Sequence, residues 1–239
     1  SLIEPGHMKG LFTDEEERKR INAFDWKREF PKVLAEGGFD VVIGNPPYIR
    51  IQAMQEWAPR EVELYKDLYR SASSGNYDIY VVFVERALKL LKDEGRLGFI
   101  IPQKFWQVQF GEPLRTLLAD GRHVAHVTNL RNNQAFPKAF VNTAIHVFTR
   151  EPNARFSYIE IPPLGKNGSL PAALMTDCES QTPASVLGRG PWVLKSASVL
   201  ALLGKLAKGR ETLKSVTDRI FQGLKTSADG IYVLDLVHA

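Results

Sequence analysis

The sequence Asn45-Pro46-Pro47-Tyr48 follows directly on a short apolar segment, residues 39–44, which reads Phe-Asp-Val-Val-Ile-Gly. Two successive prolines fit neither a central strand nor a helix interior, because each lacks an N–H and has a fixed φ. The strand predicted over residues 39–44 must therefore end here, in a stiff turn. In an α/β sheet, ligands bind at the carboxyl ends of the strands. The Asn45 amide, the free carbonyls of the turn and the Tyr48 ring are thus candidate ligand contacts.

The length and composition narrow the class of protein. With 239 residues and 44% apolar residues, the chain suits one globular domain or slightly more. No apolar run approaches the roughly 18 residues of a membrane span, and no basic-plus-apolar signal segment is recognisable. The single Cys178 excludes a disulfide framework and a cysteine-based zinc site. His123 and His126 lie in a predicted strand start, which does not favour metal ligation. We expect a cytoplasmic protein without a structural metal.

The net charge of +4 is unevenly distributed. Residues 1–184 hold 23 Lys and Arg against 23 Asp and Glu, whereas residues 185–239 hold eight against four. An excess of cations in the last quarter of the chain fits a segment that faces a polyanion. A solvated helix face is the alternative interpretation.

Apolar runs and helical periodicity alternate along the chain, which predicts an α/β sheet. An Asn76 or Asp78 cap is expected to open one of the helices, and Gly95 to end it in the left-handed conformation. The last two strands are joined by a connection without helical pattern, so we expect a mainly parallel sheet with a final antiparallel strand. The strands are predicted over 39–44, 96–101, 123–130 and 141–149, and the helices in patches over 51–72, then over 77–93 and 111–119. Both 39–44 and 96–101 read as strands buried on two faces, because their apolar runs are unbroken.

The remaining segments suggest a domain plan. Thr13-Asp14-Glu15-Glu16 is a capping box, which places a lead-in helix within residues 1–20. The main domain then covers 21–150. Residues 151–190 are rich in Pro, Gly, Ser and Thr and are predicted to be a linker or surface excursion. A new segment is expected over 191–239.

The turn at Asn45 offers a specific chemistry. An exocyclic amino group on a purine is a poor nucleophile, because its lone pair is delocalised into the ring. Two acceptors on its two N–H bonds, the Asn45 side-chain oxygen and the Pro46 carbonyl, would favour a more tetrahedral nitrogen and hold it in line with an electrophile. The Tyr48 ring could lie against the base, where a π face stabilises developing positive charge by roughly 0.5–2 kcal/mol.

Asn-Pro-Pro-Tyr after this strand resembles the catalytic motif of amino-directed DNA methyltransferases of the N6-adenine class. Residues 76–88, 95–102 and 136–145 look like the next helix, strand and late loop of that family. About residues 21–150 resemble Taq-type adenine methyltransferases and the single-chain type IIG restriction–modification enzymes. Residues 191–239 are similar to the opening of their target-recognition domain.

The resemblance implies a partial Rossmann-like sheet of an S-adenosylmethionine-dependent methyltransferase, acting on double-stranded DNA. It implies that Asn45 and Pro46 accept from the adenine N6, that Pro47 completes the turn, and that Tyr48 stacks on a base flipped out of the duplex. Phe136 would contact the same base. Phe83 would line the adenosyl pocket of the methyl donor, although it also suits a packed helix face.

The glycine-rich turn that binds the donor in this family is not found before Phe39, and the later glycines lack a strand–turn–helix context. The chain is therefore expected to hold the target-base half of the site and to bind the donor weakly. The predicted sheet would lack about three strands of seven and expose an apolar edge, so we expect self-association, or a partner surface, at Val41–Gly44.

Three functions stay open at this point. The first is a site-specific adenine-N6 DNA methyltransferase of a restriction–modification system. The second is a methyltransferase with the same motif that acts on ribosomal RNA or on protein amino groups. The third is a non-catalytic DNA-binding fragment.

Overall fold

The computed structural model describes residues 2–4, 24–73, 75–130, 142–161, 180–195, 197–209, 211 and 215–218. The chain divides into two compact units, Ser1–Ala197 and Ser198–Ala239. The capping box at Thr13–Glu16 lies outside the described residues. In the second unit, α8 (Ala197–Ala207) is the described helix. No helix among the described residues combines the length and apolarity that crossing a membrane requires.

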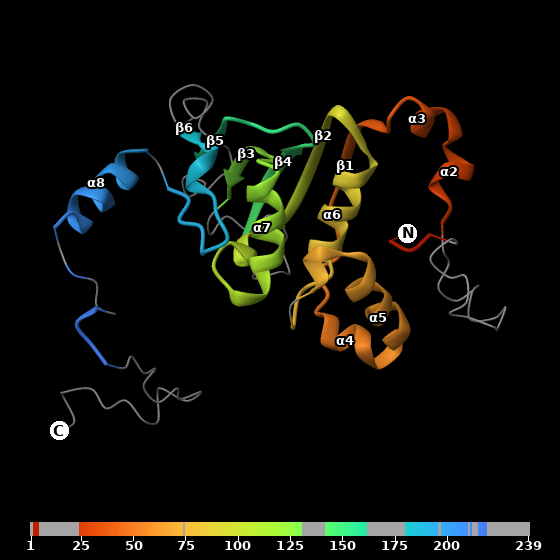
Figure 1. Ribbon diagram of the computed structural model, residues 1–239, viewed down its shortest axis with the longest axis horizontal. Coiled ribbons are helices and arrows are strands. Elements are labelled where there is room, and N and C mark those ends of the chain that lie inside the picture. Colours follow the sequence, from red (N-terminus) through yellow and green to blue (C-terminus); the bar gives the residue numbers. More distant parts are fainter. Residues whose placement is uncertain are drawn as a thin grey trace, which may run out of the picture. The chain divides into compact units, whose positions relative to one another are not determined.

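The first unit is built on a six-stranded sheet with the order β1-β2-β4-β3-β5-β6 (Figure 1). The pairs β1–β2 and β3–β5 are parallel, whereas β4 is antiparallel to both of its neighbours and β6 is antiparallel to β5. Four strands therefore share one direction and two are reversed, which confirms the predicted α/β class and the antiparallel strand after β3. The strands are β1 (Phe39–Gly44), β2 (Leu91–Pro102), β3 (Val124–Asn129), β4 (Thr143–Thr149), β5 (Arg155–Glu160) and β6 (Ser180–Pro183).

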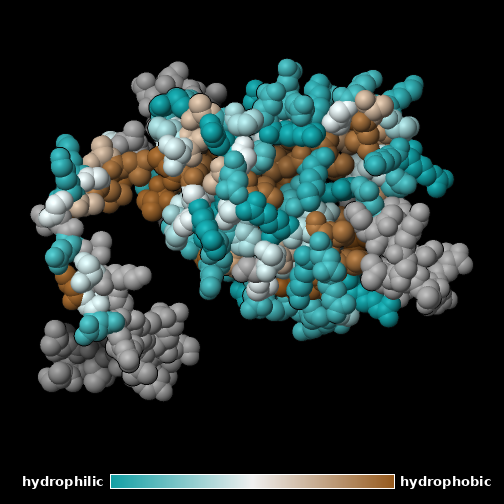
Figure 2. Space-filling view, viewed as in Figure 1, coloured by the Kyte–Doolittle hydropathy of each residue, from teal (hydrophilic) through white to brown (hydrophobic). Residues whose placement is uncertain are grey.

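Helices connect the strands and cover the sheet. Figure 1 shows α6 and α7 in front of the strands, as expected when successive crossovers between parallel strands are right-handed. In Figure 2 the same side presents mainly hydrophilic residues, with hydrophobic residues visible between them. The helices of this unit are α2 (Trp26–Glu29), α3 (Pro31–Ala35), α4 (Ile51–Trp57), α5 (Pro59–Leu68), α6 (Tyr80–Leu90) and α7 (Glu112–Asp120), with short 3-10 turns at η2 (Arg70–Ala72), η3 (Gln103–Trp106), η4 (Gln109–Gly111) and η6 (Ala184–Val186).

The segment predicted as a linker or surface excursion, 151–190, contains two strands of the sheet. Phe156 and Tyr158 in β5 are almost fully buried, and β5 pairs with β3 in parallel. The antiparallel β4 is consequently not the final strand. The alternation of Phe156 and Tyr158 spans only a few residues between Pro- and Gly-rich flanks, so composition alone predicted a loop there.

The helix predicted over 77–93 is shorter in the structure than the apolar pattern indicated. α6 begins at Tyr80 and ends at Leu90, and no side chain caps its first turn, contrary to the expected Asn76 or Asp78 cap. Gly95 does not end the helix in a left-handed conformation but lies inside β2. A Cβ at Gly95 would lie 2.7 Å from the carbonyl oxygen of Phe39, so glycine is required there by the close approach of β1 and β2.

β1 is an edge strand, and the prediction that it is buried on both faces is wrong. The side chains of Val41 and Ile43 are 54% and 82% exposed. Within the described part of the chain, no strand pairs with the outer edge of β1. In β2, Leu97, Phe99 and Ile101 are buried, whereas Gly98 and Ile100 are half-buried, so this strand is fully buried on one face only.

The predicted start of a new segment at Pro191 differs from the division of the fold. Trp192 is buried, its backbone N–H donates to the Trp106 carbonyl at 2.7 Å, and its ring packs edge-on against Phe105. These contacts attach residues 187–194 to the first unit, whose boundary falls at Ala197.

Candidate active site

The turn Asn45–Tyr48 follows the carboxyl end of β1, where β2, β3 and β5 also end because they run in the same direction. The side chains of Asn45 and Pro47 are exposed, Pro46 is buried and Tyr48 is half-buried. Within the described part of the chain, no hydrogen bond engages the Asn45 amide. A rigid, partly buried turn therefore presents an amide that is available to a ligand.

Backbone hydrogen bonds hold the chain after this turn against the segment that precedes α6. Arg50 and Asp78 form an antiparallel bridge. The Ile51 N–H donates to the Tyr77 carbonyl, and the Ile79 N–H donates to the Ile49 carbonyl, both at 2.9 Å. Positive φ values at Gly37 and Gly38 set the approach to β1 at its other end. Both ends of the strand–turn unit are thus fixed.

Tyr48 is anchored on both its ring and its hydroxyl. The hydroxyl donates to the Ile100 carbonyl at 2.9 Å, and the ring lies edge-on to Tyr80 with centroids 6.3 Å apart. Burial raises the pKa of Tyr48 to about 12. The phenol therefore stays neutral at ordinary pH and cannot act as a base. Tyr80, on the buried face of α6, is a supporting residue that sequence reasoning missed.

Phe83 and Phe136 are the two predicted site residues outside the turn. Phe83 is half-buried on α6 and packs against the hydrophobic core, in line with the packed-face interpretation. Phe136 lies outside the described residues. Three of the four turn residues are accessible at least in part, and no hydrogen bond or ring contact among the described residues joins Phe83 to them.

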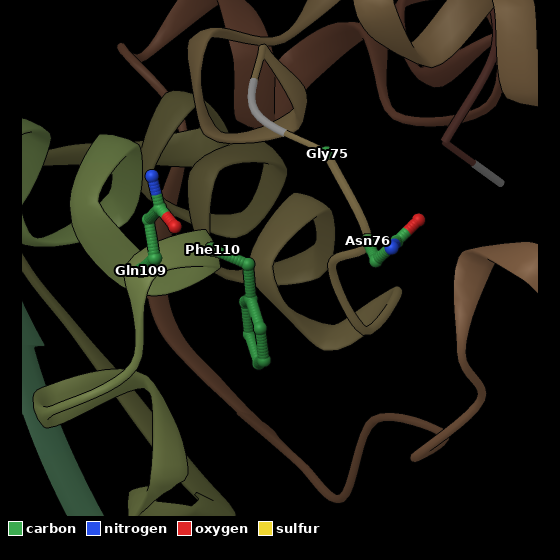
Figure 3. A pocket seen from close by; sticks show the side chains of 4 residues that line it. All are labelled: Gly75, Asn76, Gln109 and Phe110. Carbon is green, nitrogen blue, oxygen red and sulfur yellow. The ribbon is translucent and has the colours of Figure 1, made fainter. Parts of the chain in front are cut away.

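Beside the turn, two adjoining hollows of about 380 and 220 Å³ share Asn76 and Phe110. Figure 3 shows the larger one, with Gln109 and Phe110 contributed by η4, and Gly75 and Asn76 by the loop before α6. The smaller one reaches the turn itself, because Arg50 is in its wall. Its lining residues are Arg50, Gln52, Asn76, Asp78, Lys104, Val108 and Phe110.

The smaller hollow is lined by two cationic side chains, Arg50 and Lys104, and by one acid, Asp78. Burial raises the pKa of Asp78, and the neighbouring Lys104 and Arg50 partly offset that effect. The Lys104 ammonium lies 5.6 Å from the centroid of the Phe110 ring, within cation–π distance. Sequence reasoning missed this hollow, since its residues come from three separate segments and none belongs to the Asn-Pro-Pro-Tyr motif.

The histidines singled out in the sequence are engaged in the sheet. The His126 ring contacts Thr128 Oγ1 at 2.6 Å and also bonds to Ser157, while His123 Nδ1 bonds to the Thr149 carbonyl at 2.8 Å. No group of three or more His, Cys, Asp or Glu side chains among the described residues could hold a metal ion.

Comparison with known proteins shows which proteins this chain is similar to. The chain is 28% identical over 235 residues to the type II restriction enzyme and methyltransferase RM.Eco57I of Escherichia coli, covering 98% of this chain and 22% of that protein. It is 32% identical over 216 residues to the type II methyltransferase M.XhoI of Xanthomonas vasicola, covering 83% and 38%. It is 33% identical over 128 residues to the adenine-specific methyltransferase PglX of Streptomyces coelicolor, covering 48% and 10%.

The chain thus spans well under half the length of each of these relatives. The model of the Eco57I restriction-modification methylase family matches residues 2–136, which is more than half of the chain and includes β1, the turn, α6 and β2. The predicted resemblance to type II restriction–modification methyltransferases is confirmed, and the chain belongs to the Eco57I restriction-modification methylase family.

Proposed function

We propose that this chain carries the target-base side of the active site of a restriction–modification DNA methyltransferase that methylates the N6 of adenine. The observation that carries the proposal is the exposed Asn45 amide on a rigid turn at the carboxyl end of β1. The family match and the adenine-specific name of one relative support it.

In this function the Asn45 side-chain oxygen and the Pro46 carbonyl oxygen accept hydrogen bonds from the two N–H groups of the adenine amino group. These hydrogen bonds make the nitrogen more tetrahedral and localise its lone pair, so that the nitrogen can attack an electrophilic carbon. As the N–C bond forms, the bond between that carbon and its leaving group breaks. One N–H proton becomes acidic only then and passes to water, so no base is needed beforehand. The neutral Tyr48 ring, fixed by Ile100 and Tyr80, supports the flipped base.

S-adenosylmethionine, when bound, supplies the electrophilic methyl group. The described residues offer the donor one candidate contact, the half-buried Phe83 ring, which by itself does not make a donor site. We therefore assign to this chain the binding and orientation of the target base.

The test is a transfer assay with the full-length protein that contains this chain, labelled donor, and duplex DNA, ribosomal RNA or protein as acceptor. We expect label on DNA adenine, and its loss by more than a hundredfold in Asn45→Ala, because an acceptor at the reacting atom is removed. Stability should change by no more than about 0.5 kcal/mol, since the side chain is exposed. Gln55→Ala, which removes an exposed amide on α4, is the matched control and should keep full activity.

Label found on RNA or on protein and not on DNA adenine would select the alternative acceptors. Near-normal transfer by Asn45→Ala would show that the role given to Asn45 is wrong.

We also propose that the exposed edge of β1 pairs with β1 of a second copy of the chain. Val41 and Ile43 together expose a flat apolar stretch on a strand whose outer edge has no partner among the described residues. Such edges pair with other strands unless charge or a covering element prevents it.

A further inference from the structure

The smaller hollow beside the turn combines groups that suit a nucleotide. Its walls come from the residues after Tyr48, the loop before α6, and η3 and η4, all in the first unit. It brings two cationic side chains, Arg50 and Lys104, to an aromatic ring, Phe110. These segments are far apart in the sequence, so the hollow is a product of the fold.

The two cations outnumber the one acid that lines the hollow, Asp78. Both side chains are exposed, and neither forms an ion pair in the part of the chain that the structure describes. Asp78 interacts electrostatically with both cations, but one carboxylate against two cations leaves a net positive charge in the hollow. An anion that enters the hollow therefore meets positive charge from two sides.

The Phe110 ring adds a second kind of contact. The ring is half-buried against the core, and Figure 3 shows it projecting from η4. The Lys104 ammonium lies 5.6 Å from the ring centroid. Single-stranded nucleic acid is typically held by such a pairing of cations for the phosphates with an aromatic face for a base. An acidic peptide would use the cations but would leave the ring without a stacking partner.

The position of the hollow relates it to the target base. Arg50 is two residues after Tyr48, and two residues span at most about 7 Å. A site this close to the Tyr48 ring can be reached by the nucleotide that adjoins the target base on the same strand. We propose that this hollow holds the nucleotide next to the target base on the same DNA strand, with its phosphate between Arg50 and Lys104 and its base against Phe110. The place of this nucleotide relative to the target rests on the proposed function.

The test measures equilibrium binding of the 239-residue chain, without donor, to fluorescent oligothymidylate and to an abasic phosphodiester of equal length. Arg50→Ala and Lys104→Ala should each weaken binding to both probes and reduce the slope of log affinity against log salt by about 0.7. Phe110→Leu, which keeps an apolar side chain but removes the ring face, should weaken binding to oligothymidylate about tenfold and leave abasic binding unchanged. Lys32→Ala on α3, an exposed lysine outside the hollow, is the control and should bind like the unmodified chain.

Several results would overturn the proposal. The first is that the unmodified chain does not bind oligothymidylate. The second is that Lys104→Ala and Lys32→Ala bind with the same affinity. The third is that Phe110→Leu loses the same affinity for both probes. Tighter binding of oligouridylate with the same dependence on the three residues would assign the hollow to RNA instead.

The binding assay does not depend on methyl transfer, so the two proposals can fail separately. A full-length protein that methylates no DNA, in combination with the predicted binding pattern, would remove the proposed function and leave the nucleotide site. DNA methylation that is sensitive to Asn45→Ala, in combination with unaltered binding by all three variants, would remove the nucleotide site alone.

Discussion

The Tyr48 hydroxyl donates a 2.9 Å hydrogen bond to the backbone carbonyl of Ile100, 52 residues away, and so ties the end of the turn to the end of β2. The turn is therefore oriented by the neighbouring strand as well as by its own prolines. One substitution can remove the hydroxyl alone, and another can remove the whole ring. Comparing them separates the contribution of the hydrogen bond to stability from the contribution of the ring to function.

Tyr48→Phe should lower the free energy of unfolding by about 1 kcal/mol, the usual contribution of one partly buried hydrogen bond. Since the ring stays, methyl transfer by the full-length protein should fall by less than tenfold, whereas Tyr48→Ala should lose more than tenfold with the stacking surface. Urea unfolding and the transfer assay measure the two effects. Tyr65→Phe, which removes a hydroxyl bonded to Glu61 on α5, is the control and should leave transfer unchanged. Equal transfer in Tyr48→Phe and Tyr48→Ala would contradict a role for the ring.

His146 makes the stability of the fold sensitive to acid. It is completely buried on β4, Nε2 accepts from the Trp106 indole N–H at 3.1 Å, and Nδ1 donates to the Ala144 carbonyl at 3.1 Å, so the ring is neutral. Burial lowers the pKa of His146 from 6.5 to about 3. Between these values the unfolded chain binds a proton that the folded chain does not. The stabilisation is thus complete above pH 6.5 and is lost as the pH falls, by at most about 1.4 kcal/mol per pH unit.

Urea unfolding at several values between pH 6.5 and 5 measures this slope. His146→Phe should remove about 1 kcal/mol per pH unit from it, because the titrating ring is gone. Phe148→Leu, a change in the ring stacked on His146, should lower stability at every pH but keep the slope. An unaltered slope in His146→Phe would mean that other groups cause the acid sensitivity.

Arg115 supports the loop that carries Lys104 and Phe110. Its side chain is buried on α7, Nη1 donates to the carbonyls of Phe105 and Val108 at 2.6 and 2.8 Å, and Nε donates to the carbonyl of Arg189 at 3.1 Å. Arg115→Met leaves these carbonyls without their charged donor, so the free energy of unfolding should fall by about 3 kcal/mol. Arg96→Met on β2, an exposed arginine, should change it by less than about 0.5 kcal/mol. Similar urea midpoints for the two variants would show that the buried guanidinium contributes little.

Local sequence signals predicted the elements whose patterns are long or punctuated. The Pro46-Pro47 pair marked the end of β1 correctly, and the apolar runs placed β3, β4 and α7 within about two residues. The end of α6 was misplaced because Gly95 suits a helix end as well as a close strand contact, and only the position of Phe39 decides between them. The burial of β1 was misjudged for a related reason, since an apolar run does not reveal how many neighbours a strand has.

The surroundings of the turn could not be predicted, because they depend on contacts between distant segments. Nothing near Tyr48 in the sequence indicates that Ile100 and Tyr80 hold its ring. Arg50, Lys104 and Phe110 are ordinary surface residue types, and they form a hollow only after the backbone bridge between Arg50 and Asp78 brings their segments together. A motif thus locates the reacting group, whereas the groups that orient it are a property of the tertiary fold.

The exposed edge of β1 leads to the last prediction, on self-association. In sedimentation velocity, the chain at tens of micromolar should form a reversible dimer, and Ile43→Lys should abolish it, because a lysine on an edge strand opposes pairing. Ile145→Lys is the matched control. Ile145 is 39% exposed, but it lies on β4, which is already paired on both sides. Its replacement should therefore leave an edge-to-edge dimer intact. Loss of the dimer in both variants would point to packing between sheet faces, and a monomer at all concentrations in the unmodified chain would rule out β1 pairing.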